Sequence, residues 1–580
     1  MAAPHFVALD YVVLMSFLAL SAGIGVVVAW RDRRTKSNKH FLTGNRQLNW
    51  LPVSLSMMAS YLSSIGILGQ PSEVFLRGST LWTSAISATV SITVAAFVFL
   101  PMYYKMDITS INEYLEKRFM STVVRNIASV VFIMSTLLYM GVVLYGPALA
   151  LGSVTGIPVW SSILLNGVVC TFYTAIGGIK AVIWTDVVQM VLMFAGYIMV
   201  IASGLKHLGG FGNMWQIASN GGRVIYTNLS TNLYDTYTTW NVLLGYTVIW
   251  MVTYCASQTQ VQRYSSMKSL ERARRALLLN IPGVAGNLFL SVLSGLTIYA
   301  VYGDCDPRLT GDIGKADQLM PYAVQDLLRD YPGLSGLLVS AVLSGSLSTL
   351  SSGYNALAAV TWDDFVRPRV SISEGAALRL TKLMAAGYGL LSISIAFLVG
   401  SMESIIHAAS SLVGALSGPL LAIFTLGIFF PCCRKKGAIT GCLAALATSW
   451  WLSLGSIMHP READDLPTST AGCVDFNQTI TAGSFDPRPI PSGIYRFYHI
   501  SFIWIGTVGF TTHMVVSLVI SLIFERNEKE EVNPKYICPF VRRYMSNYVK
   551  KSTEHVRKEP FPTTTGASPM ELKRLMPENQ

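Results

Sequence analysis

The feature that most constrains this chain is a succession of long apolar stretches separated by short polar segments. A helix needs roughly 20 apolar residues to cross about 30 Å of hydrocarbon, and about thirteen stretches meet that requirement. Their approximate limits are 11–30, 51–71, 81–104, 126–152, 158–177, 182–204, 238–257, 276–302, 333–360, 380–400, 405–430, 437–457 and 498–523. Of the 580 residues, 52% are hydrophobic and only 13% are charged. The sequence therefore predicts an all-α, multi-pass membrane protein.

The positions of Lys and Arg predict the orientation of these spans, because basic loops stay on the cytoplasmic side of a membrane. The first connecting loop, RDRRTKSNKHFLTGNRQ, is densely basic, and alternating from there places the other basic loops on the same side. The loops assigned to the outside contain a larger share of Asp and Glu and lie near 205–237, 303–332 and 458–497. We therefore expect a plasma-membrane protein with an extracellular N-terminus (1–10), a transmembrane domain (11–523) and a cytoplasmic tail (524–580) with little fold of its own.

Net charge, sequons and cysteines agree with that orientation. Basic residues at the inner ends of spans bind anionic lipid, so the net charge of +11 does not require a nucleic-acid partner. The sequons at Asn228 and Asn477 fall in outer loops, where glycosylation occurs, although sequons are also frequent by chance. Of eight cysteines, only Cys305 and Cys473 lie in outer loops, where thiols become oxidised. A disulfide between them is a hypothesis, because the sequence does not give the distance between the loops.

The candidate functional residues lie inside the spans. The motifs HExxH, GxSxG and GxxxxGK[ST] and paired CxxC are absent from the sequence, which disfavours an enzyme and implies no organic cofactor. The densest polar cluster is SGSLSTLSSGYN (344–355), in which Gly345, Ser348, Thr349 and Ser352 share one helical face. Packing of small residues between helices would explain this pattern. The same hydroxyls could also offer uncharged oxygens to Na⁺, a hard ion that takes several oxygen ligands.

The second span predicts a broken helix. In LSMMASYLSSIGILGQPSEVFLRG, the residues Gly66, Gly69 and Pro71 interrupt an apolar run. A break frees backbone carbonyls, and transporters use such carbonyls to hold Na⁺ near the middle of the membrane. An ordinary proline kink near the outer end of the span is the alternative.

Several stretches of this sequence resemble the sodium:solute symporter family, and within it the branch of the monocarboxylate, multivitamin and iodide transporters. The similarity extends over nearly the whole chain outside the cytoplasmic tail. The stretches that carry it are YTAIGGIKAVIWTDVVQ (173–189), QTQVQRYSS (258–266), GDCDP (303–307), ADQLMPYAVQDLLRDYPGL (316–334) and SGSLSTLSSGYNALAAVT (344–361).

The resemblance implies a leucine-transporter-type core of two inverted five-helix repeats, about 51–204 and 238–430, each beginning with a broken helix. It implies a sodium-coupled symporter that imports a small organic anion such as a monocarboxylate. Import of biotin or pantothenate, or of iodide, is the alternative, and a sensor that binds solute without transporting it is less favoured. The oligomeric state does not follow from the resemblance.

The resemblance also implies sites, carried over residue by residue. The main sodium site corresponds to the backbone carbonyls of Ala59, Leu62 and Gly345 and the hydroxyls of Ser348 and Thr349. A candidate second sodium site corresponds to Ser63 and Tyr139. The solute site corresponds to Gly66, Gln70, Trp250, Tyr254, Gln258, Ile406 and Ser410.

Two departures from the family pattern bear on these sites. In the iodide branch, the position of Gly66 holds Gln and that of Ser410 holds a large apolar side chain. The pocket of this chain should therefore be roomier and more polar, which favours an organic anion over iodide. The second sodium site loses a Gln partner through the same change at Gly66.

Ionisable residues near the spans have structural interpretations. His407 lies one helical turn from Ser410 and could titrate there, although a histidine satisfied by its neighbours is favoured. Asp186 and Lys180 frame the cytoplasmic start of a span, where a structural ion pair or a helix-end role is expected. Arg77, at the outer end of the second span, should meet lipid headgroups or a gate. With no Lys or Arg expected in mid-span, bound Na⁺ and helix ends would supply the positive field for an anion.

Overall fold

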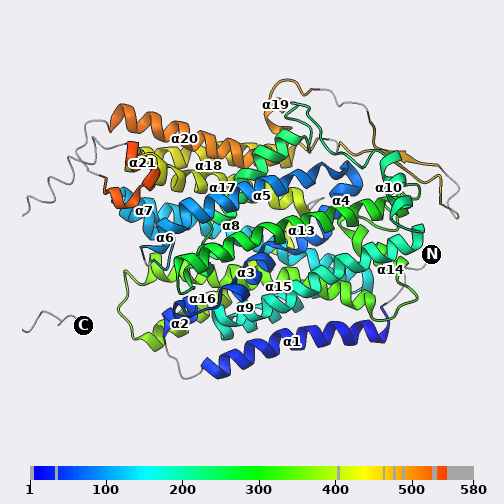
Figure 1. The fold of residues 1–580 in the computed structure, drawn as a ribbon, viewed down its shortest axis with the longest axis horizontal. Coiled ribbons are helices and arrows are strands. Elements are labelled where there is room, and N and C mark those ends of the chain that lie inside the picture. The colour runs from blue at the N-terminus through cyan, green and yellow to red at the C-terminus, as the bar shows by residue number, and fades with distance from the viewer. Residues whose placement is uncertain are drawn as a thin grey trace, which may run out of the picture.

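Long helices lie side by side in this molecule, and short elements and loops gather at the two ends of the bundle (Figure 1). The computed structural model describes residues 6–32, 37–106, 108–400, 405–461, 464–473, 479–485, 490–525 and 532–544. One end of the bundle holds α7 (Asn112–Phe119) and α21 (Pro539–Tyr544), and the opposite end holds α10 (Phe211–Asn220) and α14 (Leu319–Leu327).

The first half of the chain forms the following further elements: α1 (Ala8–Asp32), α2 (Asn38–Thr43), η1 (Gly44–Arg46), α3 (Trp50–Tyr61), α4 (Ser64–Arg77), η2 (Ser79–Thr83), α5 (Ser84–Val94), η3 (Ala95–Phe99), α6 (Leu100–Tyr104), α8 (Thr122–Thr155) and α9 (Val159–Leu208). The second half forms η4 (Asn241–Gly245), α11 (Tyr246–Met251), η5 (Val252–Ala256), α12 (Gln258–Ser265), α13 (Leu270–Tyr302), η6 (Ala316–Gln318), α15 (Leu334–Val360), η7 (Thr361–Val366), α16 (Glu374–Val399) and α17 (Ile405–Phe429). The last elements are α18 (Lys435–Met458), the short antiparallel strands β1 (Thr468–Ser469) and β2 (Thr481–Ala482), α19 (Tyr495–Tyr498), α20 (Ile503–Phe524) and η8 (Pro534–Tyr536).

The described residues contain ten helices long and apolar enough to cross a membrane, or eleven if the bent pair α3–α4 counts as one span. The expected count of about thirteen is not confirmed. The predicted spans 158–177 and 182–204 both lie in α9, which non-helical backbone at Gly178 (φ 61°, ψ −164°) divides. The predicted span 238–257 appears as the shorter apolar helical run Asn241–Ala256.

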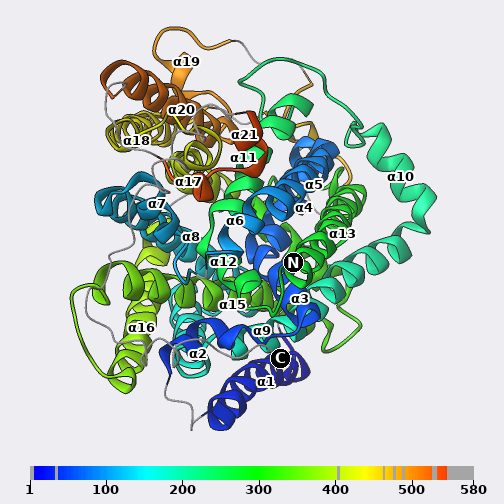
Figure 2. The same ribbon diagram turned by 60° about the vertical axis from the view of Figure 1, so that its left-hand side comes forward.

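The outward faces of the peripheral helices are apolar, as a lipid environment requires. Leu383 and Leu398 of α16 are 68% and 75% exposed, and Val515 of α20 is 60% exposed. Helices α17, α18 and α20 lie together on one side of the bundle in both views (Figures 1 and 2). The interior faces carry the buried side chains that form the core.

Helix α15 lies in the interior of the molecule, and its residues 338–360 are all buried. Its N-terminus has no capping side chain of its own. Asp10 of α1 supplies one, because its buried carboxylate accepts hydrogen bonds from Gly333 N (3.0 Å) and Gly336 N (2.9 Å). The first span therefore fixes the end of the helix that carries the hydroxyl cluster.

The segment after α20 contains two short described elements. Residues 532–544 form η8 and α21, and Ile537 and Cys538 are buried. Cys538 N donates to Ile428 O at 3.0 Å, at the end of α17. The apolar side chains of this segment pack on α7 and α17, and residues 526–531 and 545–580 of the predicted tail lie outside the described residues.

Candidate functional site

The second span is broken where α3 meets α4. Leu62 (φ −70°, ψ 76°) and Ser63 (φ −85°, ψ 169°) leave the helical conformation, and the two helices are bent by 52°. The predicted break is thus present, but it precedes Gly66, and Pro71 lies inside α4. Glycine and proline mark the broken span without fixing the residue at which it breaks.

The break leaves two backbone carbonyls without a donor. Other carbonyls are paired as follows: Met58 O accepts from Leu62 N (3.0 Å), Ser60 O from Thr349 Oγ1 (3.1 Å), Tyr61 O from Ser63 N (2.8 Å), and Ser63 O from Gly66 N (3.0 Å) and Ile67 N (3.3 Å). Among the described residues, no hydrogen bond reaches Ala59 O or Leu62 O. Unpaired buried carbonyls are costly, so these two are available to a cation.

Helix α15 lies directly against this break. A Cβ added to Gly345 would lie 2.9 Å from Leu62 O, so only glycine allows the two backbones to come this close. Thr349 Oγ1 lies 2.9 Å from Gly345 O and 3.1 Å from Ser60 O. Ser348 Oγ lies 3.4 Å from Ser60 Oγ. The structure therefore brings together the segments that hold the five expected sodium ligands.

A buried ion pair lies beside these hydroxyls. Arg263 of α12 donates to Asp186 Oδ2 at 2.9 Å, and their side chains are 2% and 0% exposed. Ser56 Oγ donates to the same carboxylate at 2.6 Å, and Arg263 also donates to Ser352 Oγ. Asp186 therefore has Arg263 as its ion-pair partner, whereas the sequence placed it beside Lys180. Arg263 lies beyond the predicted span 238–257, so the sequence did not identify this buried cation.

The candidate second sodium site also comes together. Tyr139 of α8 donates from its hydroxyl to Ser63 Oγ at 3.3 Å, next to the helix break. Gly66, one turn further along α4, has only the side chain of Gln70 within 4 Å of an added Cβ. The space left by the missing Gln is therefore open.

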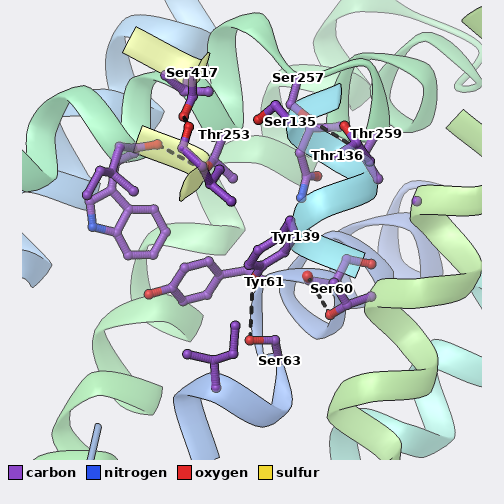
Figure 3. Close-up of a pocket in the computed structure, with 18 of the residues that line it drawn as sticks. Ser60, Tyr61, Ser63, Ser135, Thr136, Tyr139, Thr253, Ser257, Thr259 and Ser417 are labelled. Atoms are coloured by element: carbon purple, nitrogen blue, oxygen red, sulfur yellow. Dashed lines mark hydrogen bonds between the residues drawn. The ribbon is translucent and has the colours of Figure 1, made fainter. Parts of the chain in front are cut away.

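A cavity of about 260 Å³ adjoins the break and contains no charged side chain in its lining. Ser60, Leu62, Ser63 and Thr349 line both the cavity and the break. Figure 3 shows the rings of Tyr61 and Tyr139 in the middle of this space, with hydroxyl side chains around them. The hydroxyl residues labelled there on α8, η5, α12 and α17 and in the loop between η5 and α12 are Ser135, Thr136, Thr253, Ser257, Thr259 and Ser417.

Three of the expected solute residues line this cavity, namely Gly66, Gln70 and Trp250. Trp250 is 1% exposed, and its ring lies 4.1 Å from that of Tyr61. Tyr254 lies outside the lining, and its hydroxyl donates to Asn280 Oδ1 at 3.2 Å.

Gln258 lies outside the lining as well. Its amide bonds to Ile111 N (2.8 Å) and Thr109 O (2.6 Å) and holds α12 to the loop before α7. Ser257, the residue before it, has an extended backbone (φ −90°, ψ 124°) and separates η5 from α12. The span that begins at η4 is therefore broken too. Ile406 and Ser410 lie on α17, but their side chains, like that of His407, lie outside the described part of the chain.

Sequence reasoning missed two amide side chains of the cavity, Gln260 and Asn287. Gln260 donates to Met57 O at 3.3 Å, whereas Asn287 Nδ2 and Oδ1 have no partner among the described residues. Asn287 lies within the predicted span 276–302, where any amide costs free energy unless something satisfies it. An amide within a predicted span was therefore the sequence signal that could have identified Asn287.

At the opposite end of α4, Arg77 joins a network of carboxylates. It forms ion pairs with Glu73, with Asp464 (2.9 Å) and with Asp465 (3.1 Å). Burial would raise the pKa of Asp464, but the Arg77 guanidinium and hydrogen bonds from Thr236 outweigh it and hold that pKa below its usual 3.8. Arg77 therefore fastens α4 to the loop between α18 and α20.

The loop between α18 and α20 also contains Cys473, which forms a disulfide. Cys305 and Cys473 are joined by a disulfide in the structure. Asn228 lies in the loop after α10, where its side chain accepts from Ser230 N at 3.2 Å. Asn477 lies outside the described residues. The described residues contain no group of His, Cys, Asp or Glu that could hold a metal ion.

The model described as "Sodium:solute symporter family" matches residues 41–445. Sodium-coupled monocarboxylate transporter 1 of Homo sapiens is 38% identical over 95% of this chain and 93% of its own, and transporter 2 of Mus musculus is 37% identical over 92% and 87%. The sodium-dependent multivitamin transporter of Oryctolagus cuniculus is 38% identical over 93% and 86%.

Among solved structures, a Na⁺-coupled sialic acid symporter in a substrate-bound, outward-open state is similar with a TM-score of 0.73. It covers 90% of this chain and 98% of its own at 22% sequence identity. This likeness shows the fold, and the expected all-α, leucine-transporter-type class is confirmed.

Proposed function

Because this chain belongs to the sodium:solute symporter family, we propose that it imports a small monocarboxylate across the plasma membrane, driven by the sodium gradient. Repeats 51–204 and 238–430 would form the transport core. The basic loops favour an extracellular N-terminus and a cytoplasmic C-terminus.

The proposed sodium site consists of the carbonyls of Ala59, Leu62 and Gly345 and the hydroxyls of Ser348 and Thr349. The observation that carries it is the pair of unpaired carbonyls at the break, which face a helix that approaches as closely as glycine allows. Such uncharged oxygens suit a hard monovalent cation. Ser63 and Tyr139 are proposed as a second, weaker site on the strength of their 3.3 Å contact.

Coupling follows from residues that belong to both sites. Leu62 and Thr349 contribute to the proposed sodium site and also line the cavity. A sodium ion that holds the break and α15 together would therefore stabilise the cavity shape that binds solute. Solute affinity then rises with sodium and, by linkage, sodium affinity rises with solute.

The proposed solute is a small organic anion. The cavity of about 260 Å³ is lined by apolar, hydroxyl and amide side chains without a charge, so it suits a compact molecule with an apolar part. The names of the relatives at 37% and 38% identity point to monocarboxylates. Gly66 in its lining leaves the space that the iodide branch fills with Gln.

The sodium site is tested with the double variant Ser348→Ala/Thr349→Ala. We expect sodium affinity to fall at least tenfold, the scale for weakening a metal site, and concentrative uptake to be lost at normal surface abundance. The matched control is Ser340→Ala/Ser344→Ala, which removes two α15 hydroxyls that donate only to carbonyls four residues earlier. Unchanged sodium dependence in the first variant would refute the site.

The multivitamin relative favours a second candidate function, uptake of biotin or pantothenate. Uptake of labelled lactate, butyrate, nicotinate, biotin, pantothenate, iodide and choline, each with and without Na⁺, separates the candidates. Sodium-dependent lactate or butyrate uptake supports the monocarboxylate proposal. Uptake restricted to biotin and pantothenate supports the second candidate. Solute binding without uptake identifies a sensor.

A further inference from the structure

Helix α13 packs on the broken span through two glycines and carries a buried amide, Asn287, between them. Asn287 comes four residues after Gly283 and eight residues before Gly295 in α13. A Cβ added to Gly283 would lie 2.4 Å from Met58 Sδ of α3, and one added to Gly295 would lie 2.6 Å from Pro71 O of α4. Helix α13 therefore packs on both halves of the broken span, and its Asn287 lines the cavity that adjoins the gap between them.

Asn287 has no protein partner in that gap. Its side chain lines the cavity, is 1% exposed, and leaves both Nδ2 and Oδ1 without a hydrogen bond among the described residues. Asn280, two turns earlier on α13, is satisfied by Ser54, Ala276 and Tyr254. An unsatisfied buried amide is destabilising, so the one that faces the cavity is held for a ligand.

A second unpaired donor belongs to a residue that lines the same cavity. Trp250 Nε1 is buried and has no hydrogen-bond acceptor in the described part of the chain. Of the other two cavity amides, Gln70 lies on α4 and Gln260 already donates to Met57 O. An anion in a cavity without Lys, Arg or His must be held by sodium and by neutral N–H and O–H donors. Asn287 Nδ2 and Trp250 Nε1 are the side-chain N–H donors of the lining that are both buried and without a partner among the described residues.

We propose that Asn287 Nδ2, together with Trp250 Nε1, donates hydrogen bonds to the carboxylate of the solute and so selects anions in this cavity. This inference rests on the proposed function, because it assigns the anion-recognising groups of that same site. The apolar part of the solute would then lie against lining residues such as Phe132, Ile249 and Leu420.

The test is sodium-driven uptake of labelled butyrate by the full-length protein, with the half-saturating concentration and the maximal rate measured separately. Asn287→Leu keeps the branched shape and removes both polar atoms. It should raise the half-saturating butyrate concentration roughly ten- to a hundredfold, the effect of losing a hydrogen bond to a charged group. The maximal rate per surface molecule should change little.

Asn166→Leu is the matched control. Asn166 of α9 is also 1% exposed and also lacks partners for Nδ2 and Oδ1 among the described residues, but it does not line the cavity. We expect its butyrate half-saturation to equal that of the wild type. An equal rise in both variants would mean that any buried amide lost from the bundle has this effect, and would overturn the proposal.

Asn287→Asp separates anion recognition from sodium ligation. It removes the donor and places a negative charge beside the carboxylate, so butyrate uptake should be lost. If Oδ1 were instead a sodium ligand, Asn287→Asp would keep uptake and lower the half-saturating sodium concentration, which would overturn the proposal. Wild-type half-saturation in Asn287→Leu would overturn it while the proposed function stands. A wild-type protein without sodium-dependent carboxylate uptake would overturn both.

Discussion

Replacing Gly345 with Ala should weaken sodium binding without preventing folding. The added Cβ would lie 2.9 Å from Leu62 O, 3.0 Å from the carbonyl carbon of Ser63 and 3.0 Å from Ser64 N. All three atoms are backbone, so none can rotate away as a side chain would, and α15 must retreat from the break. Overpacking of this kind costs about 1–3 kcal/mol.

This strain should affect sodium binding because it arises next to a proposed sodium ligand. Leu62 O is one of the proposed sodium ligands, and the distance across the cage must grow by a few tenths of an ångström to accept the methyl group. If the strain is confined to the sodium-bound arrangement, about 1–3 kcal/mol corresponds to a rise of roughly 5- to 150-fold in half-saturating sodium. The gain in helix propensity from Gly to Ala, about 1 kcal/mol, acts on both states of the site and does not cancel this shift.

The assay is a sodium titration of labelled butyrate uptake at fixed solute, normalised to surface abundance by biotinylation. Gly387→Ala in α16 is the control, because nothing lies within 4 Å of its added Cβ. It should leave the sodium dependence unchanged. Wild-type sodium dependence in Gly345→Ala at normal abundance would refute the proposed contact between α15 and the sodium site.

The loops at the Arg77 end of the bundle give three further predictions. Arg77→Ala should lower the thermal unfolding temperature of the purified protein, because breaking a buried ion pair costs about 3–5 kcal/mol; a melting temperature equal to that of the exposed control Arg275→Ala would contradict this. Since the pKa of Asp464 is held below its usual 3.8, the stability gained from its ionisation is fully present above that value and falls as the pH drops through the lowered pKa. A melting temperature that declines in the wild type and in Asp464→Asn equally below pH 4 would argue against this linkage. Cys305→Ser opens a loop of 168 residues and should cost about 2–5 kcal/mol, seen as a lower melting temperature that reductant does not lower further.

The identities of the spans could be predicted from sequence because hydrocarbon leaves little choice. Backbone groups in lipid must be paired within the segment, so each long apolar stretch becomes a helix wherever it packs. The hydroxyl cluster of α15 and the broken second span were visible for a related reason, since polar side chains and chain breaks are too costly in a membrane to occur without compensation.

The tertiary structure decided which of these groups are free and which are paired. Thr349 donates to Ser60 O, 289 residues away. No local pattern shows that Ser60 O is paired while Ala59 O and Leu62 O have no donor among the described residues. Asp186 was visible in sequence, but its partner Arg263 comes from another span. These choices depend on helices that meet only in the folded bundle, because hydrogen-bond saturation is settled by contacts across the chain. Sequence alone therefore determined where polar groups stand in the membrane, and the fold decided which of them remain free for an ion or an anion.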